Sequence, residues 1–67
     1  MHLIINGKDY DDLPEGLTVT ALIEHLELRE CKVAIERNRE VVPKSEYGKT
    51  LLANHEELEI IHFIGGG

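Results

Sequence analysis

The sequence has a single cysteine, one phenylalanine, two prolines, no tryptophan and no long apolar run. Because Cys31 is alone, no internal disulfide can form, and the fold does not depend on an oxidising compartment. No apolar stretch approaches the ~20 residues that span a bilayer, and the first residues lack a signal-peptide pattern. These absences argue against membrane and secreted proteins and predict a cytoplasmic one.

Basic residues are also scarce, since 7 Lys and Arg stand against 13 Asp and Glu, for a net charge of −6 with neutral histidines. A protein of this charge repels phosphate, which argues against binding to nucleic acid. The acidity instead predicts partners with basic surfaces, whose association salt weakens.

The chain has 67 residues, enough for one small domain, and its apolar content of 42% is that of a folded protein. A core of this size gives about 3–5 kcal/mol of stability, which leaves little scope for a deep catalytic cleft. We therefore expect a monomeric carrier, adaptor or modifier rather than an enzyme. Residues 1–64 are expected to form the domain and residues 65–67 a flexible C-terminal tail.

The first residues predict a β-hairpin. Asn6-Gly7 separates two short β-rich runs and favours a type I′ turn. In that register Ile5 faces Lys8 and Leu3 faces Tyr10, with the two apolar residues and the tyrosine pointing inward.

A helix is expected next, capped by Thr18. Val19, Leu22, Ile23 and Leu26 form one apolar stripe on a helix of about ten residues. Such a helix is marginal alone in water, so it must pack on a sheet.

Three more strands are expected, at residues 33–35, 40–42 and 58–64. Pro43 ends the second of them, and Asn38-Arg39 is a weaker turn because arginine disfavours positive φ. The order predicts an α+β fold with a mixed sheet of four to five strands and one main helix packed on one face. The first and last strands can pair in parallel, as in the β-grasp, or ubiquitin-like, arrangement.

The chain ends in Gly65-Gly66-Gly67, which reaches roughly 10 Å when extended. A frayed terminus is the simple interpretation. A free carboxylate on a slender tail can also be threaded into a partner and activated as a mixed anhydride with AMP, which a sulfur or nitrogen nucleophile displaces. These glycines lack the Lys-Ser/Thr of a phosphate-binding loop, so a partner enzyme must supply ATP and metal.

Four apolar residues are expected on the sheet face opposite the helix and predict a docking face, with the last two as anchors: Ile4, Ala34, Ile61 and Phe63. The four histidines have no metal-ligand spacing, so no metal site is predicted. Cys31 is interpreted as a half-buried small hydrophobe, although a thiol that exchanges sulfur is an alternative.

The sequence resembles the ThiS family of sulfur carriers in thiamine biosynthesis. The matching stretches cover nearly the whole chain: Asn6-Gly7-Lys8, Thr18-Val19 with Leu22-Ile23, Glu36 to Pro43, and Leu58 to Gly67. A terminal Gly-Gly alone is shared with ubiquitin and MoaD, whereas the Glu-Arg-Asn turn and the His-Phe-Ile-Gly-Gly-Gly ending are more specific to ThiS.

The resemblance implies that Gly67, preceded by Gly66, is adenylated by the E1-like enzyme ThiF with ATP and Mg. Sulfur from a cysteine desulfurase then yields a thiocarboxylate, on which the thiazole synthase ThiG draws. The outer face of the last strand, continued by Ile64 and Gly65, is implied to dock on ThiF and ThiG, and the chain itself binds no cofactor. A MoaD-like carrier for another pathway, a protein modifier that conjugates lysines, and a module with an inert tail remain alternatives.

Overall fold

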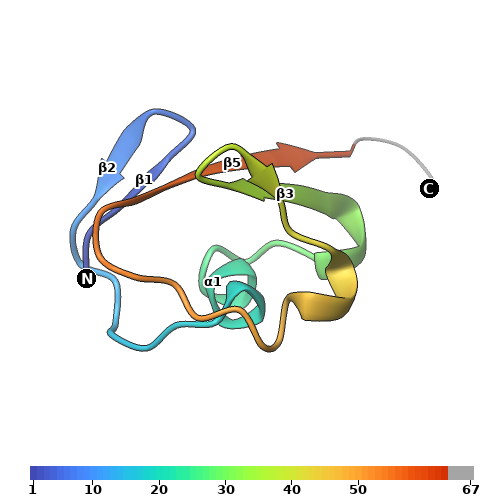
Figure 1. Ribbon diagram of the computed structural model, residues 1–67, viewed down its shortest axis with the longest axis horizontal. Coiled ribbons are helices and arrows are strands. Elements are labelled where there is room, and N and C mark those ends of the chain that lie inside the picture. The colour runs from blue at the N-terminus through green and yellow to red at the C-terminus, as the bar shows by residue number, and fades with distance from the viewer. Residues whose placement is uncertain (64–67) are drawn as a thin grey trace.

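The computed structural model describes residues 1–63 and contains a five-stranded sheet with one α-helix on one face (Figure 1). In chain order the elements are β1 (Leu3–Ile5), β2 (Lys8–Tyr10), α1 (Val19–His25), the 3₁₀ helix η1 (Glu30–Lys32), β3 (Val33–Arg37), β4 (Glu40–Val41), the 3₁₀ helix η2 (Lys44–Glu46) and β5 (Glu56–His62). The strands lie in the order β2-β1-β5-β3-β4, with β1 and β5 parallel and the other neighbours antiparallel. This arrangement confirms the predicted mixed sheet of β-grasp type.

The first hairpin has the predicted register, with Leu3 opposite Tyr10 and Ile5 opposite Lys8. Its turn, Asn6-Gly7, has φ angles of 52° and 80°, as a type I′ turn requires. The side chains of β1 that were expected inside are buried, and the tyrosine packs against the core. The turn chemistry therefore fixes which face of β1 meets the helix.

The second hairpin also turns through two residues of positive φ, 51° at Asn38 and 71° at Arg39. Arginine disfavours this conformation, so the turn needs support from outside the hairpin. That support comes from β5: the main-chain N–H of Asn38 donates to the carbonyl of Glu57 at 2.8 Å. The asparagine side chain also accepts from the N–H of Glu57 and donates to the Glu56 carboxylate.

β5 is the central strand, and it begins two residues earlier than predicted, at Glu56. The reason is pairing, because Glu56 and Glu57 lie beside the first two residues of β1. β5 runs to His62, whereas the predicted last residue of the strand, Ile64, lies outside the described residues. Leu58 is buried, as the predicted alternation requires.

α1 starts as predicted, because the Thr18 hydroxyl accepts a hydrogen bond from the N–H of Ala21 at 3.1 Å. The helix has seven residues rather than about ten. It ends in a Schellman motif around Glu27, whose φ is 60°. The N–H of Leu28 donates to the carbonyl of Ile23, and that of Glu27 donates to Glu24. Within residues 1–63, no helix is long and apolar enough to cross a membrane.

We expect Glu27→Gly to raise the free energy of unfolding by about 0.5–1 kcal/mol. Glycine adopts the left-handed conformation without a Cβ clash, and the change removes a negative charge from the negative end of the helix dipole. Urea unfolding measures the change. Glu24→Gly is the control, because glycine in the helix body lowers stability by about 1 kcal/mol. A loss of stability in both variants would contradict the motif.

The buried core lies between the sheet and α1 and continues under the segment that links β4 to β5. Its members are Leu3, Ile5, Leu13, Leu17, Val19, Leu22, Ile23, Val33, Ile35, Val42, Tyr47, Leu52 and Leu58. Tyr47 was not predicted, although only 1% of its surface is exposed. Its carbonyl accepts from the N–H of Thr20, and burial raises the pKa of its phenol. Tyr47 therefore ties the β4–β5 linker to the helix.

Candidate docking face and carrier tail

The predicted reactive residues and the two residues before them lie outside the part of the chain that the structure describes: Ile64, Gly65, Gly66 and Gly67. The structure does define the strand that leads to them. β5 runs toward the end of the molecule opposite Met1 (Figure 1), and the N–H of Phe63 donates to the carbonyl of Lys32 at 2.7 Å. Strand pairing with the β3 side thus continues up to the start of the tail.

Three of the predicted docking residues gather at this end of the sheet. Ala34 on β3 lies directly opposite Ile61 on β5, on the face away from α1. Phe63 follows two residues later and shares that face by strand alternation. Ile61 is 52% exposed and Phe63 48%, both high for large apolar side chains. We call Ala34, Ile61 and Phe63 the terminal patch.

Ile4, the fourth predicted docking residue, lies apart from the terminal patch. It is half-buried and pairs with Glu57 on β5. Because strands rise about 3.3 Å per residue, the stretch from Glu57 to Ile61 separates Ile4 from Ile61 by about 13 Å. The structure therefore brings together three of the four residues, and the parallel register of β1 and β5 places the other beside a carboxylate.

Carboxylates occupy the outer face between these two apolar positions. Glu57 and Glu59 precede Ile61 on the same face of β5, and Glu59 lies directly opposite Glu36 of β3. Like charges in opposite positions of a sheet are destabilising unless a cation relieves them. We call Glu36, Glu57 and Glu59 the acidic band. Sequence reasoning missed it, although the alternation of glutamates with isoleucine along β5 was a usable signal.

The structure also brings together two histidines that lie 53 positions apart in the sequence. The Nδ1 atoms of His2 and His55 are 2.9 Å apart, and His2 Nε2 lies 2.8 Å from the Asp9 carboxylate. Among residues 1–63, no group of three or more histidine, cysteine or acidic side chains could hold a metal ion. Cys31 is exposed, so its interpretation as a half-buried residue was wrong.

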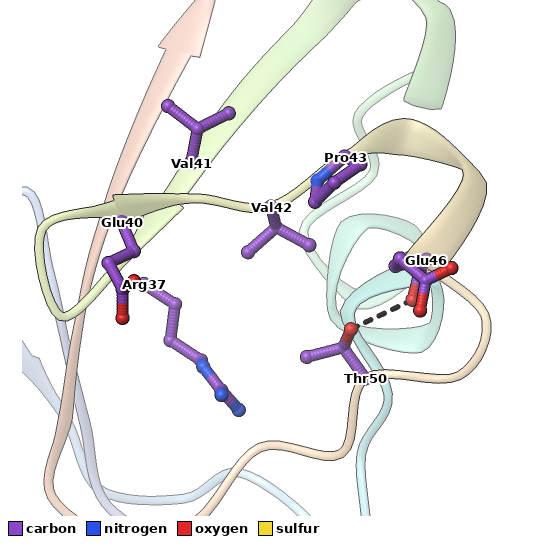
Figure 2. Close-up of a pocket in the computed structure, with 7 residues that line it drawn as sticks. All are labelled: Arg37, Glu40, Val41, Val42, Pro43, Glu46 and Thr50. Atoms are coloured by element: carbon purple, nitrogen blue, oxygen red, sulfur yellow. Dashed lines mark hydrogen bonds between the residues drawn. The ribbon is translucent and has the colours of Figure 1, made fainter.

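A cavity of about 200 Å³ lies beside the β3–β4 hairpin and η2, and Figure 2 shows the residues that line it. Its lining residues are Arg37, Glu40, Val41, Val42, Pro43, Glu46 and Thr50. The Arg37 guanidinium already has partners, since Nη1 donates to the carbonyl of Leu51 at 3.2 Å and Nε lies 3.7 Å from the Glu56 carboxylate. With two further glutamates in the lining, the cavity offers no uncompensated positive charge to an anionic ligand.

The mixed five-stranded sheet with one helix on one face places the protein in the β-grasp, or ubiquitin-like, class. The chain belongs to the ThiS family, whose sequence pattern matches residues 3–67. This is a family of sulfur carrier proteins of thiamine biosynthesis.

Two proteins of similar length resemble this chain. It is 35% identical over 97% of its length to the sulfur carrier protein ThiS of Bacillus subtilis, of which it covers 98%. The crystal structure of the thiamine biosynthesis protein ThiS from Geobacter metallireducens superposes with a TM-score of 0.84, at 33% identity and 100% coverage of both chains.

Longer proteins contain a similar segment. Over all 67 residues the chain is 45% identical to a thiazole synthase of Paramagnetospirillum magneticum and 37% identical to one of Magnetococcus marinus. It spans 20% of the length of each of these two enzymes. In both cases the carrier-like segment and a much longer remainder belong to one polypeptide.

Proposed function

We propose that the chain carries sulfur to thiazole formation in thiamine biosynthesis as a thiocarboxylate on Gly67. The observation that carries this proposal is the family match, which runs through the three terminal glycines to residue 67. Gly67 is the reactive residue, Gly66 and Gly65 give it a tail without side chains, and the domain presents that tail. The activation consumes ATP, which is available in the cytoplasm, the compartment that we propose for this step.

The chemistry needs an activating enzyme of the ThiF type, which supplies ATP and Mg. A carboxylate oxygen of Gly67 attacks the α-phosphorus of ATP, forming an acyl adenylate and releasing pyrophosphate. The terminal sulfur of a cysteine desulfurase persulfide then attacks the Gly67 carbonyl carbon, and AMP leaves with the bonding electrons. A thiol then attacks the desulfurase cysteine sulfur of the resulting acyl disulfide. The S–S bond breaks, the thiocarboxylate leaves on Gly67, and a disulfide joins the thiol to the desulfurase cysteine.

A thiazole synthase of the ThiG type is the proposed acceptor of this sulfur. The two longer relatives support this partner, because each combines a segment similar to the whole chain with a protein named thiazole synthase. Covalent linkage keeps a carrier at high local concentration beside its acceptor. A separate carrier needs a docking surface to achieve the same end.

The terminal patch and the acidic band are proposed as that docking surface, for both the activating enzyme and the synthase. The exposed Ile61 and Phe63 lie next to the tail, so seating them brings Gly67 close to the partner's active site. The acidic band then faces basic groups at the rim, which relieve the repulsion between Glu36 and Glu59. Binding should accordingly weaken as salt concentration rises.

We expect Phe63→Asp to weaken binding to a ThiF-type enzyme by about tenfold or more, because the change removes an apolar anchor and adds charge. Thermal stability should stay nearly unchanged, since the side chain is 48% exposed. Titration calorimetry measures the affinity. Leu51→Asp is a matched control, because Leu51 is 62% exposed and lies off the sheet. Equal affinity of wild type and Phe63→Asp would contradict the docking surface.

The adenylation step is tested by ATP–pyrophosphate exchange with a ThiF-type enzyme and Mg. Exchange should depend on the chain and disappear when the Gly67 carboxylate is amidated. An enzyme that exchanges with another ThiS-family carrier but not with this chain would contradict the proposal. Recovery of lysine conjugates from cells would instead identify a protein modifier, and sulfur transfer into molybdopterin would identify a MoaD-like carrier.

A further inference from the structure

Asn6, at the tip of the first hairpin, binds both main-chain groups of a single residue of the central strand. Its side-chain Oδ1 accepts from the N–H of Ile60 at 2.8 Å, and its Nδ2 donates to the carbonyl of Ile60 at 3.2 Å. Its own main-chain N–H donates to the carbonyl of Leu58 at 2.9 Å. Figure 1 shows the hairpin beside β5, at the point where the strand heads toward the tail.

The contact supplies hydrogen bonds to the part of β5 that extends beyond the end of β1. β1 pairs with β5 only as far as Ile5 and Leu58. Beyond that point β5 has a strand neighbour on its β3 side alone, where the N–H of Phe63 donates to Lys32. Because main-chain groups alternate between the two edges of a strand, those of Ile60 face the edge that β1 has left. The carboxamide of Asn6 takes the place of the absent peptide group.

We propose that Asn6 is a positioning residue for sulfur loading: it holds the end of β5 at Ile60, directly before the terminal patch and the tail. The inference rests on the function proposed above. Ile61 and Phe63 follow Ile60 directly, so the orientation of this strand end decides how the terminal patch meets a partner. Asn6 fixes this orientation before binding, which lowers the entropic cost of docking.

Asparagine meets two requirements at this position. Its φ of 52° is tolerated by asparagine and glycine. Its short side chain also offers one donor and one acceptor, as a peptide group does. Aspartate would keep the acceptor but point a second acceptor at the carbonyl of Ile60, and glycine would keep the turn without any side-chain contact.

The second hairpin supplies a matched control. Asn38 has a φ of 51°, and its side chain also makes two hydrogen bonds to β5. These bonds reach Glu56 and Glu57, at the start of the strand rather than at its end. Asn6→Gly and Asn38→Gly therefore each remove two side-chain hydrogen bonds to β5, the first near the end of the strand and the second at its start.

The test compares the two variants in steady-state loading by a ThiF-type enzyme. Asn6→Gly and Asn6→Asp should raise KM for the carrier about five- to tenfold with kcat within about twofold, because the lost hydrogen bonds affect docking rather than chemistry. Asn38→Gly should change KM by less than about twofold at a comparable melting temperature. An equal KM increase in both glycine variants, or none in Asn6→Gly, would overturn the positioning role.

Amide hydrogen exchange tests the same inference without any partner. The Ile60 amide should exchange about tenfold faster in Asn6→Gly, while the Glu57 amide responds instead in Asn38→Gly. Unchanged exchange at Ile60 would overturn the contact itself.

The loading experiment separates failure of the positioning role from failure of the proposed function. If the wild type cannot be loaded at all, the proposed function fails, and with it any role of Asn6 in loading. If wild type and Asn6→Gly are loaded equally well, only the positioning role is overturned.

Discussion

Deletion of Gly67 is expected to abolish sulfur loading while leaving the unfolding transition of the domain unchanged. The reacting carbonyl belongs to this residue in the proposed mechanism, and a shortened tail cannot carry the next carbonyl to the same place in a partner's site. The buried core of the described residues runs from Leu3 to Leu58 in the sequence, so we expect the deletion to leave this core intact. Mass spectrometry after incubation with the activating enzyme measures loading, and circular dichroism follows unfolding.

Gly67→Ala is the informative companion to this deletion. It retains the length of the tail and its carboxylate but adds a Cβ, so we expect loading to slow by at least about tenfold if the partner's channel fits glycine only. A deletion variant that still gains sulfur would show that another group is the acceptor. A deletion variant with a lower melting temperature would show that the tail contributes to the fold.

Tyr47→Ala is expected to unfold the protein. Replacing a fully buried aromatic side chain costs about 3–5 kcal/mol, and a core of this size supplies only about the same amount. Tyr47 is 1% exposed, so loss of its ring leaves a cavity between the β4–β5 linker and the helix. The hydrogen bond from the N–H of Thr20 to the main-chain carbonyl of residue 47 is retained in the variant. Urea titration followed by circular dichroism gives the free energy of unfolding.

Two controls show whether the loss of stability comes from the buried ring of Tyr47. One removes only its hydroxyl, and the other removes a less buried tyrosine. Tyr47→Phe keeps the packing and should cost only about 1 kcal/mol. Tyr10→Ala removes a half-buried tyrosine of β2 and should cost clearly less than Tyr47→Ala. A Tyr47→Ala protein with a cooperative transition close to that of wild type would contradict the packing of the linker described above.

The local features of the fold could be predicted from the sequence because each depends on neighbouring residues. Asn6-Gly7 set the hairpin register, Thr18 set the helix start, and the alternation around Leu58 set the inner face of the last strand. The helix end could not be placed because Glu27 adopts the left-handed conformation that usually marks glycine. The helix ends through the backbone conformation of Glu27, and no glycine in the sequence marks this position.

The remaining features depend on contacts between distant segments. Tyr47 stands among polar residues and is buried only because the linker folds over the helix. The sequence predicts a loop at Glu56, but this residue belongs to β5 because it pairs with Leu3 of β1. The register of that same pairing separates Ile4 from Ile61, so the four residues predicted to share the outer face of the sheet do not form one cluster. The two bonds from Asn6 to Ile60 span 54 positions, which no local pattern reveals.

The identity of the reactive centre is tested most directly by the mass of the intact chain after reaction with a ThiF-type enzyme, ATP, Mg and a persulfide source. Replacement of one oxygen by sulfur should raise the mass by about 16 Da, and fragmentation should locate the added mass on Gly67. An unchanged mass with a demonstrably active enzyme, added mass on Cys31, or a mature polypeptide that continues past residue 67 without processing would contradict the account.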